Sequence, residues 1–166
     1  FIRMSTNGIL VRKKISSIGK LDSINISMDS YDSDSFYKYR KGTPKQFDQI
    51  IDGLEALNEK GIKFSLSYIV TKENLHTVPK MIDFSEKMKA NLVHFHNINP
   101  HGSDQFTSLM IQDDDTTQFL NTILERTDYP FDITLPVIFD PQSPSFGETG
   151  CSQPWSHLLY NSLGNV

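Results

Sequence analysis

Residues 43–71, TPKQFDQIIDGLEALNEKGIKFSLSYIVT, join a helix pattern to a strand pattern through a single glycine. Thr43 and Pro44 suit the N-cap and the first position of a helix, and the glycine suits its end. After the glycine, apolar and polar residues alternate with a period of two, which is typical of a strand. The stretch therefore predicts a helix over 44–60 and a strand over 62–71. The apolar stripe of the helix is Phe47, Ile50, Ile51, Leu54 and Leu57.

The same alternation of strand and helix extends to both sides of this stretch. Repeated strand–helix units indicate an α/β fold whose parallel strands are joined by right-handed crossovers. A Pro-, Ser- and Gly-rich segment from 140 to 150 reads as a linker. The remaining expected strands are 1–4, 24–29, 92–98 and 132–139, and the remaining expected helices are 9–19, 76–89 and 113–126, with a turn at 5–8 and a loop over 99–112.

Composition limits the partners and the compartment. The 166 residues carry a formal net charge of -4, which gives no support to a nucleic-acid or membrane-surface partner. No apolar run reaches the length of a membrane span. One cysteine excludes an intramolecular disulfide and fits a reducing, cytoplasmic compartment. Both ends read as if cut within an element, so we expect a piece of a longer protein.

Polar residues gather where the expected strands end. In parallel α/β folds the chemistry collects at the carboxyl ends of the strands. Thr6 and Asn7 lie at one such end, and Ser27 and Asp29 lie at the next. Alternation predicts that Ser27 and Asp29 point to the same side, where they would suit the hydroxyls and amine of a polar ligand. The alternative is an Asx turn or a cap for a helix over 33–39.

Two histidines, His94 and His96, share one face of the strand expected at 92–98. Their spacing suits zinc, and His76 and His101 would be further ligands. The stronger interpretation is a pair of ordinary histidines at a half-exposed strand.

Each of three other polar features has two possible interpretations. The amides between Asn97 and Gly102 suit the edges of a base such as adenine, or an ordinary turn. Arg40 suits a carboxylate or a phosphate, or a solvated turn. Cys151 is either a thiolate metal ligand or a packed thiol.

Four stretches together carry a family resemblance. STNG, LDSINISMDS, YRKGTPKQFDQIIDGLEALNEKGIKFSLSYIVTKEN and VHFHNINPHG resemble the successive strand-end motifs of radical S-adenosylmethionine (SAM) enzymes. Their order is similar to the C-terminal half of the family's partial TIM barrel, from its third strand onward, over residues 1–140. Residues 141–166 resemble a linker and the start of the SPASM or twitch extension found in molybdenum-cofactor biosynthesis and peptide-maturing enzymes.

The resemblance implies roles for residues at the SAM site. Ser27 would hydrogen-bond SAM, and Asp29 would support it. Thr6 and Asn7 would face the SAM or substrate pocket, and Asn99 would lie beside the adenine.

Two further residues receive roles from the resemblance. Arg40 would approach the SAM carboxylate or the substrate. Cys151 would ligate an auxiliary iron–sulfur cluster.

The resemblance also implies the activity of the parent protein. Such enzymes use a [4Fe–4S] cluster to cleave SAM to a 5′-deoxyadenosyl radical, which abstracts hydrogen from a substrate; a peptide is one candidate. The family's C-x-x-x-C-x-x-C motif is absent from the sequence. We therefore expect the chain alone to be inactive and to bind neither SAM nor the cluster appreciably. The alternatives are a zinc-dependent barrel hydrolase using His94 and His96, and a non-catalytic binding module. A half-barrel exposes its outer strands, which predicts oligomerisation through those edges.

Overall fold

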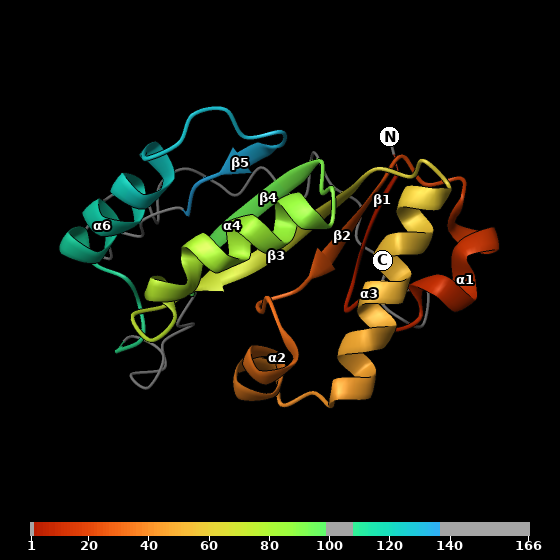
Figure 1. Cartoon of the computed structure of the whole chain (residues 1–166), viewed down its shortest axis with the longest axis horizontal. Coiled ribbons are helices and arrows are strands. Elements are labelled where there is room, and N and C mark those ends of the chain that lie inside the picture. The colour runs from red at the N-terminus through yellow and green to blue at the C-terminus, as the bar shows by residue number, and fades with distance from the viewer. Residues whose placement is uncertain (1, 99–107, 137–166) are drawn as a thin grey trace, which may run out of the picture.

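A computed structural model describes residues 2–98 and 108–136 of the chain. It contains a five-stranded sheet in the order β1-β2-β3-β4-β5, with every neighbouring pair parallel (Figure 1). The predicted α/β class with parallel strands is confirmed. The strands are β1 (Arg3–Thr6), β2 (Ser23–Ser27), β3 (Phe64–Val70), β4 (Leu92–Asn97) and β5 (Asp132–Thr134). The helices are α1 (Val11–Ile18), α2 (Ser33–Arg40), α3 (Pro44–Glu59), the 3-10 turn η1 (Leu75–Thr77), α4 (Val78–Lys87) and α6 (Asp113–Leu124).

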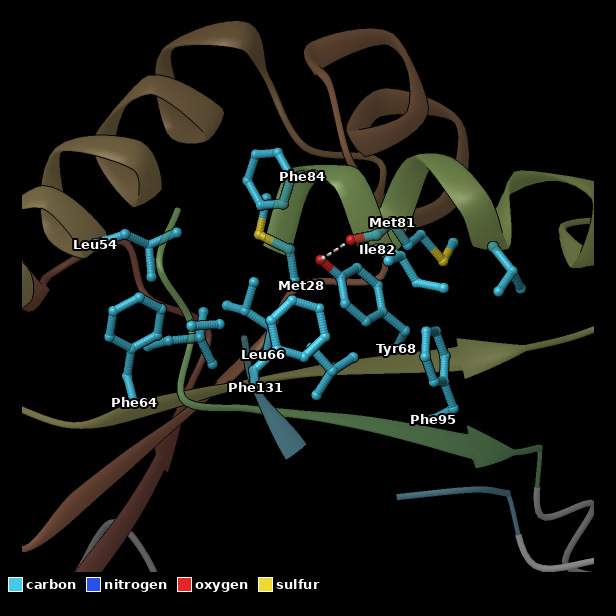
Figure 2. Close-up of a cluster of buried hydrophobic side chains, with 14 of the residues drawn as sticks. Met28, Leu54, Phe64, Leu66, Tyr68, Met81, Ile82, Phe84, Phe95 and Phe131 are labelled. Atoms are coloured by element: carbon cyan, nitrogen blue, oxygen red, sulfur yellow. Dashed lines mark hydrogen bonds between the residues drawn. The ribbon is translucent and has the colours of Figure 1, made fainter. Parts of the chain in front are cut away.

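The strands follow one another in the sheet in chain order, so each crossover returns on the same side. The apolar residues of the strands and the helices meet in one layer on that side (Figure 2). Leu66 and Tyr68 of β3 are fully buried there, and Leu54 of α3 and Met81 of α4 pack above the sheet. Tyr68 places its hydroxyl 3.0 Å from Ser85 Oγ, so its polar end is satisfied inside the core.

Local signals set the ends of the helices. Thr43 caps α3 as predicted, and it forms a capping box with Gln46. Asp32 caps α2 in the same way with Ser35. The predicted cap of this helix is therefore present, but Asp32 supplies it and Asp29 does not.

Several predicted boundaries differ from the observed ones by one or more residues, and three of these errors have a clear structural cause. β1 occupies residues 3–6, because its pairing with β2 continues to Thr6 opposite Ile26. The helix expected over 76–89 begins as the 3-10 turn η1 and becomes α-helical at Val78. The alternation expected through Asp29 stops at Ser27, because Asp29 adopts a φ of 49° and leaves the strand. The last strand ends at 134 within the described residues, and the expected 135–139 extension lies mostly beyond them.

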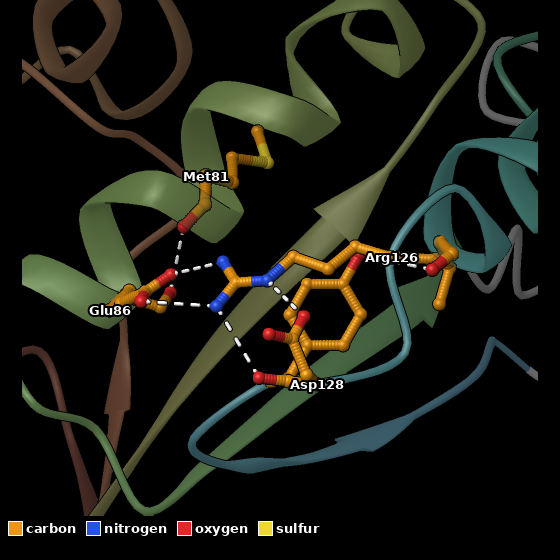
Figure 3. A network of polar contacts seen from close by, with 7 residues as sticks. Met81, Glu86, Arg126 and Asp128 are labelled. Carbon is orange, nitrogen blue, oxygen red and sulfur yellow. Dashed lines mark hydrogen bonds and ion pairs between the residues drawn. The ribbon is translucent and has the colours of Figure 1, made fainter.

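Hydrogen bonds and ion pairs of Arg126 connect the segment after α6 to α4. The guanidinium of Arg126 donates hydrogen bonds to Glu86 and Asp128, and it lies 5.1 Å from the ring centroid of Tyr129 (Figure 3). This fixes the approach of the chain to β5.

β1 and β5 are the outer strands of the described sheet. The expectation that such edges pair with another chain stays a prediction. None of the helices in residues 2–98 and 108–136 is long and apolar enough to cross a membrane.

A close contact at Gly42 yields a test of the packing. A Cβ at this position would lie 2.0 Å from the buried ring of Phe36, which packs on Phe47. We expect Gly42→Ala to lower the free energy of unfolding by about 1 to 3 kcal/mol, because the ring must shift. Urea unfolding followed by circular dichroism measures this change.

The matched control is Gly19→Ala, where the nearest atom to an added Cβ is 3.8 Å away and φ is −64°. Its effect should stay within about 0.5 kcal/mol. Equal effects of the two substitutions would contradict the packing around Gly42.

Candidate functional site

The face of the sheet that points away from the helices is almost entirely polar. Strand alternation places every second residue there, opposite the apolar set that packs under the helices. The pairing of the strands aligns four of these residues in one row, Ser27–Ser67–His94–Thr134, across β2 to β5. We call this surface the polar face. Its members are Arg3, Ser5, Ser23, Asn25, Ser27, Ser65, Ser67, Ile69, Leu92, His94, His96, Asp132 and Thr134.

Asn25 organises the middle of the polar face. Its Oδ1 accepts hydrogen bonds from Ser65 Oγ at 2.9 Å and from Ser67 Oγ at 2.8 Å. Both serine hydroxyl protons are thereby used, and the serine oxygens remain able to accept. The face can therefore hydrogen-bond the hydroxyls and the amine of a polar ligand.

Asp29 connects three segments at the carboxyl end of β2. Its Oδ1 accepts a hydrogen bond from the backbone N–H of Ile69 at 2.6 Å. Its Oδ2 accepts one from Arg40 Nη1 at 2.8 Å, and its side chain is only 11% exposed. The structure thus brings the predicted residues Asp29 and Arg40 together. Both oxygens of Asp29 are occupied by the protein, so a supporting role suits it better than direct ligand contact.

The surroundings of Asp29 shift the pKa of its carboxyl. Burial raises the pKa of its carboxyl above the ordinary value of 3.8. The hydrogen bond from Ile69 and the charge of Arg40 act in the opposite direction, and His96 adds a smaller effect of the same sign as Arg40.

The predicted residues of the first strand end are arranged differently from Ser27. Thr6 stands opposite Ile26, which places it on the helix side of the sheet, and its Oγ1 accepts from Gly8 N–H at 3.3 Å. Asn7 is exposed, and its Oδ1 accepts from Ile9 N–H at 3.2 Å. Both side chains therefore stabilise the turn into α1.

The two histidines of β4 lie side by side on the polar face. Their rings stack with centroids 5.8 Å apart, and Nδ1 of His94 is 2.7 Å from Thr134 Oγ1. In the part of the chain that the structure describes, no group of three His, Cys, Asp or Glu side chains is placed to hold a metal ion. His76 lines a different place, a cavity of about 280 Å³ between α2 and η1 that also includes Tyr31 and Tyr39.

Asn97 ends β4 with a buried side chain, which strand alternation places on the helix side, opposite Val70. It is 8% exposed, and within the described residues neither its amide oxygen nor its amide nitrogen has a hydrogen-bond partner. A buried amide without partners is costly, and a hydrogen-bonding ligand or water would relieve it. Asn99, His101 and Cys151, which the sequence also singled out, lie outside the described residues.

Sequence reasoning missed three contributors to the face. Asn25, Ser67 and Thr134 join it only through pairing with neighbouring strands. The polar positions of the alternating pattern in β2 and β3 were the available signal for the first two.

The resemblance implies two cofactors, SAM and a [4Fe–4S] cluster, and the described residues suit SAM better than the cluster. The hydroxyls of the polar face and the unsatisfied amide of Asn97 suit the ribose and the base of SAM. A [4Fe–4S] cluster needs several thiolates, and the single cysteine of the sequence, Cys151, is not among the described residues. These residues alone do not fit the cluster.

Comparison with known proteins gives concordant findings. The family model described as "Radical SAM superfamily" matches residues 1–85 of the 166-residue chain. An Fe-coproporphyrin III synthase of Methanosarcina barkeri is 29% identical over 133 residues, which are 75% of this chain and 32% of that protein. A probable GTP 3',8-cyclase of Saccharolobus solfataricus is 30% identical over 105 residues, which are 61% of this chain and 33% of that protein.

A solved structure shares the fold. SuiB of Streptococcus suis, bound to S-adenosylmethionine, superposes with a TM-score of 0.63 at 16% identity, over 83% of this chain and 33% of that one. SuiB bound to the precursor peptide SuiA gives a TM-score of 0.61 at 17% identity, over 80% of this chain and 31% of that one. The chain thus spans about a third of the length of the proteins it matches.

Because Asp29 accepts a hydrogen bond at each carboxylate oxygen, different substitutions there should lower the stability by different amounts. Asp29→Ala removes the acceptor of the Ile69 N–H and places alanine at a positive φ, so we expect a loss of about 1 to 3 kcal/mol in the free energy of unfolding. Asp29→Asn keeps an acceptor oxygen and tolerates that φ, so its loss should be smaller. Denaturant titration of both variants tests this order, and the reverse order would contradict it.

The raised pKa of Asp29 predicts a pH dependence. The folded state binds the proton more tightly than the unfolded state, so this carboxyl favours folding most below the ordinary pKa of 3.8. That contribution is lost as pH rises through the folded pKa. The free energy of unfolding of the wild type minus that of Asp29→Asn, measured from about pH 3 to about pH 7, should therefore fall with rising pH. A difference that grows with pH would show a lowered pKa instead.

Proposed function

The chain belongs to the radical SAM superfamily, and we propose that its polar face, together with Asn97 at the carboxyl end of β4, forms the ribose and adenine side of a SAM site and part of the substrate wall. The observation that carries this proposal is the row of polar side chains from Ser27 to Thr134 across four parallel strands. Ligands of α/β folds bind at the carboxyl ends of such strands.

Individual residues take distinct parts in the proposed site. Ser27 hydrogen-bonds the ribose, while Asp29 holds the exit of β2 against β3 and, through Arg40, against α2. The amide of Asn97 pairs with an edge of the adenine, which would satisfy its two buried atoms. Asn99, outside the described residues, keeps its proposed role beside the adenine. Asn7 lies at the carboxyl end of β1, beside the proposed pocket.

Two predicted residues have weaker support. Thr6 lies on the helix side, so its contribution is to shape the turn before α1. Arg40 is engaged by Asp29, so we propose that it sets the charge of the site and leaves direct contact to other groups.

The parent activity is part of the proposal. A [4Fe–4S] cluster, when bound, supplies the electron for reductive cleavage of SAM and so starts hydrogen abstraction from a substrate. In the cluster-loaded parent protein, this part of the chain would help to bind and orient SAM and would shield one side of the reaction from water. Cys151 is proposed as a ligand of an auxiliary cluster.

The proteins compared above suggest three candidate substrate classes. Their names contain a coproporphyrin, GTP and a precursor peptide. The zinc hydrolase alternative has less support, because His94 and His96 have no third ligand within residues 2–98 and 108–136.

The proposed role of Ser27 has a matched control on the same strand. Ser23 shares its residue type, strand, face and half-buried state, but it lies at the amino end. In the reconstituted holoprotein that carries this chain, Ser27→Ala should weaken SAM binding about 3- to 10-fold, the equivalent of one hydrogen bond. Ser23→Ala should leave the affinity unchanged.

Isothermal calorimetry measures the affinities, and formation of 5′-deoxyadenosine after reduction reports the activity. Unchanged SAM affinity in Ser27→Ala, with a folded protein, would exclude Ser27 from the site.

A further inference from the structure

The histidine pair of β4 has no assigned role. His94 and His96 lie beyond residues 1–85, the part of the chain that the family model matches. The match to the family model therefore does not extend to them. Their placement on the polar face calls for an explanation from chemistry.

Thr134 holds one of the two rings in place. Its Oγ1 lies 2.7 Å from Nδ1 of His94, so a residue of β5 fixes the orientation of a ring on β4. The other ring nitrogen of His94 has no hydrogen bond within the described residues. His96 makes none there either, and it is exposed. The pair thus presents oriented, unused ring nitrogens on one surface.

Two cationic groups act on His94. Burial lowers the pKa of His94 first, and the charges of His96 and Arg3 on β1 lower it further.

Two carboxylates lie near this surface. Asp29 is ion-paired with Arg40, and the exposed Asp132 stands opposite Leu92, two residues before His94 on β4. A ligand that brought negative charge to this surface would meet the ring nitrogens of His94 and His96.

We propose that His94 and His96, with His94 oriented by Thr134, bind a carboxylate group of the substrate. The substrate class is therefore an acidic molecule that presents a carboxylate to the β4 side of the polar face. This inference rests on the proposed function, because it takes the polar face as the substrate wall.

The source of the carboxylate follows from the shape of SAM. In that molecule the ribose separates the adenine from the methionyl carboxylate. With the adenine over the carboxyl end of β4 at Asn97 and the ribose over the carboxyl end of β2 at Ser27, two strand spacings or about 10 Å away, the methionyl carboxylate points away from β4. The carboxylate at the histidine pair then belongs to the substrate.

Acetate is the first probe, read by NMR of the histidine Cε1–H signals at constant ionic strength. We expect saturable shifts at His94 and His96 and a raised pKa of His94, because a bound anion stabilises the imidazolium. Binding should weaken up to about tenfold for each pH unit above that pKa. His76, which lies outside the polar face, is the control.

Five variants separate binding at the histidine pair from nonspecific effects at the surface. His94→Gln and His96→Gln should abolish the saturable shift of the partner ring, and His76→Gln should change nothing. Thr134→Val should weaken acetate binding and change the tautomer ratio of His94, while Thr134→Ser should restore both. Shifts at His94 and His96 no larger than at His76 would overturn the proposal.

The affinity for SAM in the reconstituted holoprotein distinguishes the two sources of the carboxylate. His94→Gln and His96→Gln should leave this affinity unchanged, and acetate should not compete with SAM. Competition, or a loss as large as that of Ser27→Ala, would assign the carboxylate to SAM and overturn the assignment to the substrate. Acetate binding at the pair with no effect of Ser27→Ala on SAM would instead leave the carboxylate site standing and reject the proposed SAM site.

Discussion

The register of the central strand β3 constrains the rest of the molecule. Its even-numbered residues from Phe64 to Val70 are buried under the helices, while Ser65 and Ser67 face the other way. A slip of one residue would exchange the two sets, placing serine hydroxyls in the apolar layer and a phenylalanine ring on the polar face. The same strand register therefore determines both the apolar core and the polar face that carries the candidate site.

Asp29 couples the site to the fold in a second way. Its carboxylate joins the exit of β2, the backbone of β3 and the end of α2, through Ile69 and Arg40. A buried carboxylate is costly unless it is hydrogen-bonded, and here two donors meet that requirement. The loop that follows Ser27 is thus held in place by the protein itself, so that the Ser27 hydroxyl can be positioned before any ligand arrives.

The polar face has two chemically different sides. Serine hydroxyls and an amide dominate β2 and β3, whereas β4 carries paired imidazoles with Thr134 behind them. Neutral hydrogen-bonding groups suit a ribose, and imidazoles suit an anion. The proposed SAM site would use the first side, and the proposed carboxylate site would use the second.

The sequence by itself determined the α/β class, the parallel strands, the apolar faces of the helices and the strand ends at which polar residues gather. These follow from local periodicity and capping, which depend on residues near one another in the chain. Only the tertiary structure decided that Asp29 leaves the strand to reach Ile69 and Arg40, that Thr6 lies on the helix side, and that Thr134 orients His94. The last of these contacts joins residues 40 positions apart. Such contacts depend on which residues of separate strands stand opposite one another, and that pairing forms only when distant parts of the chain assemble into the sheet.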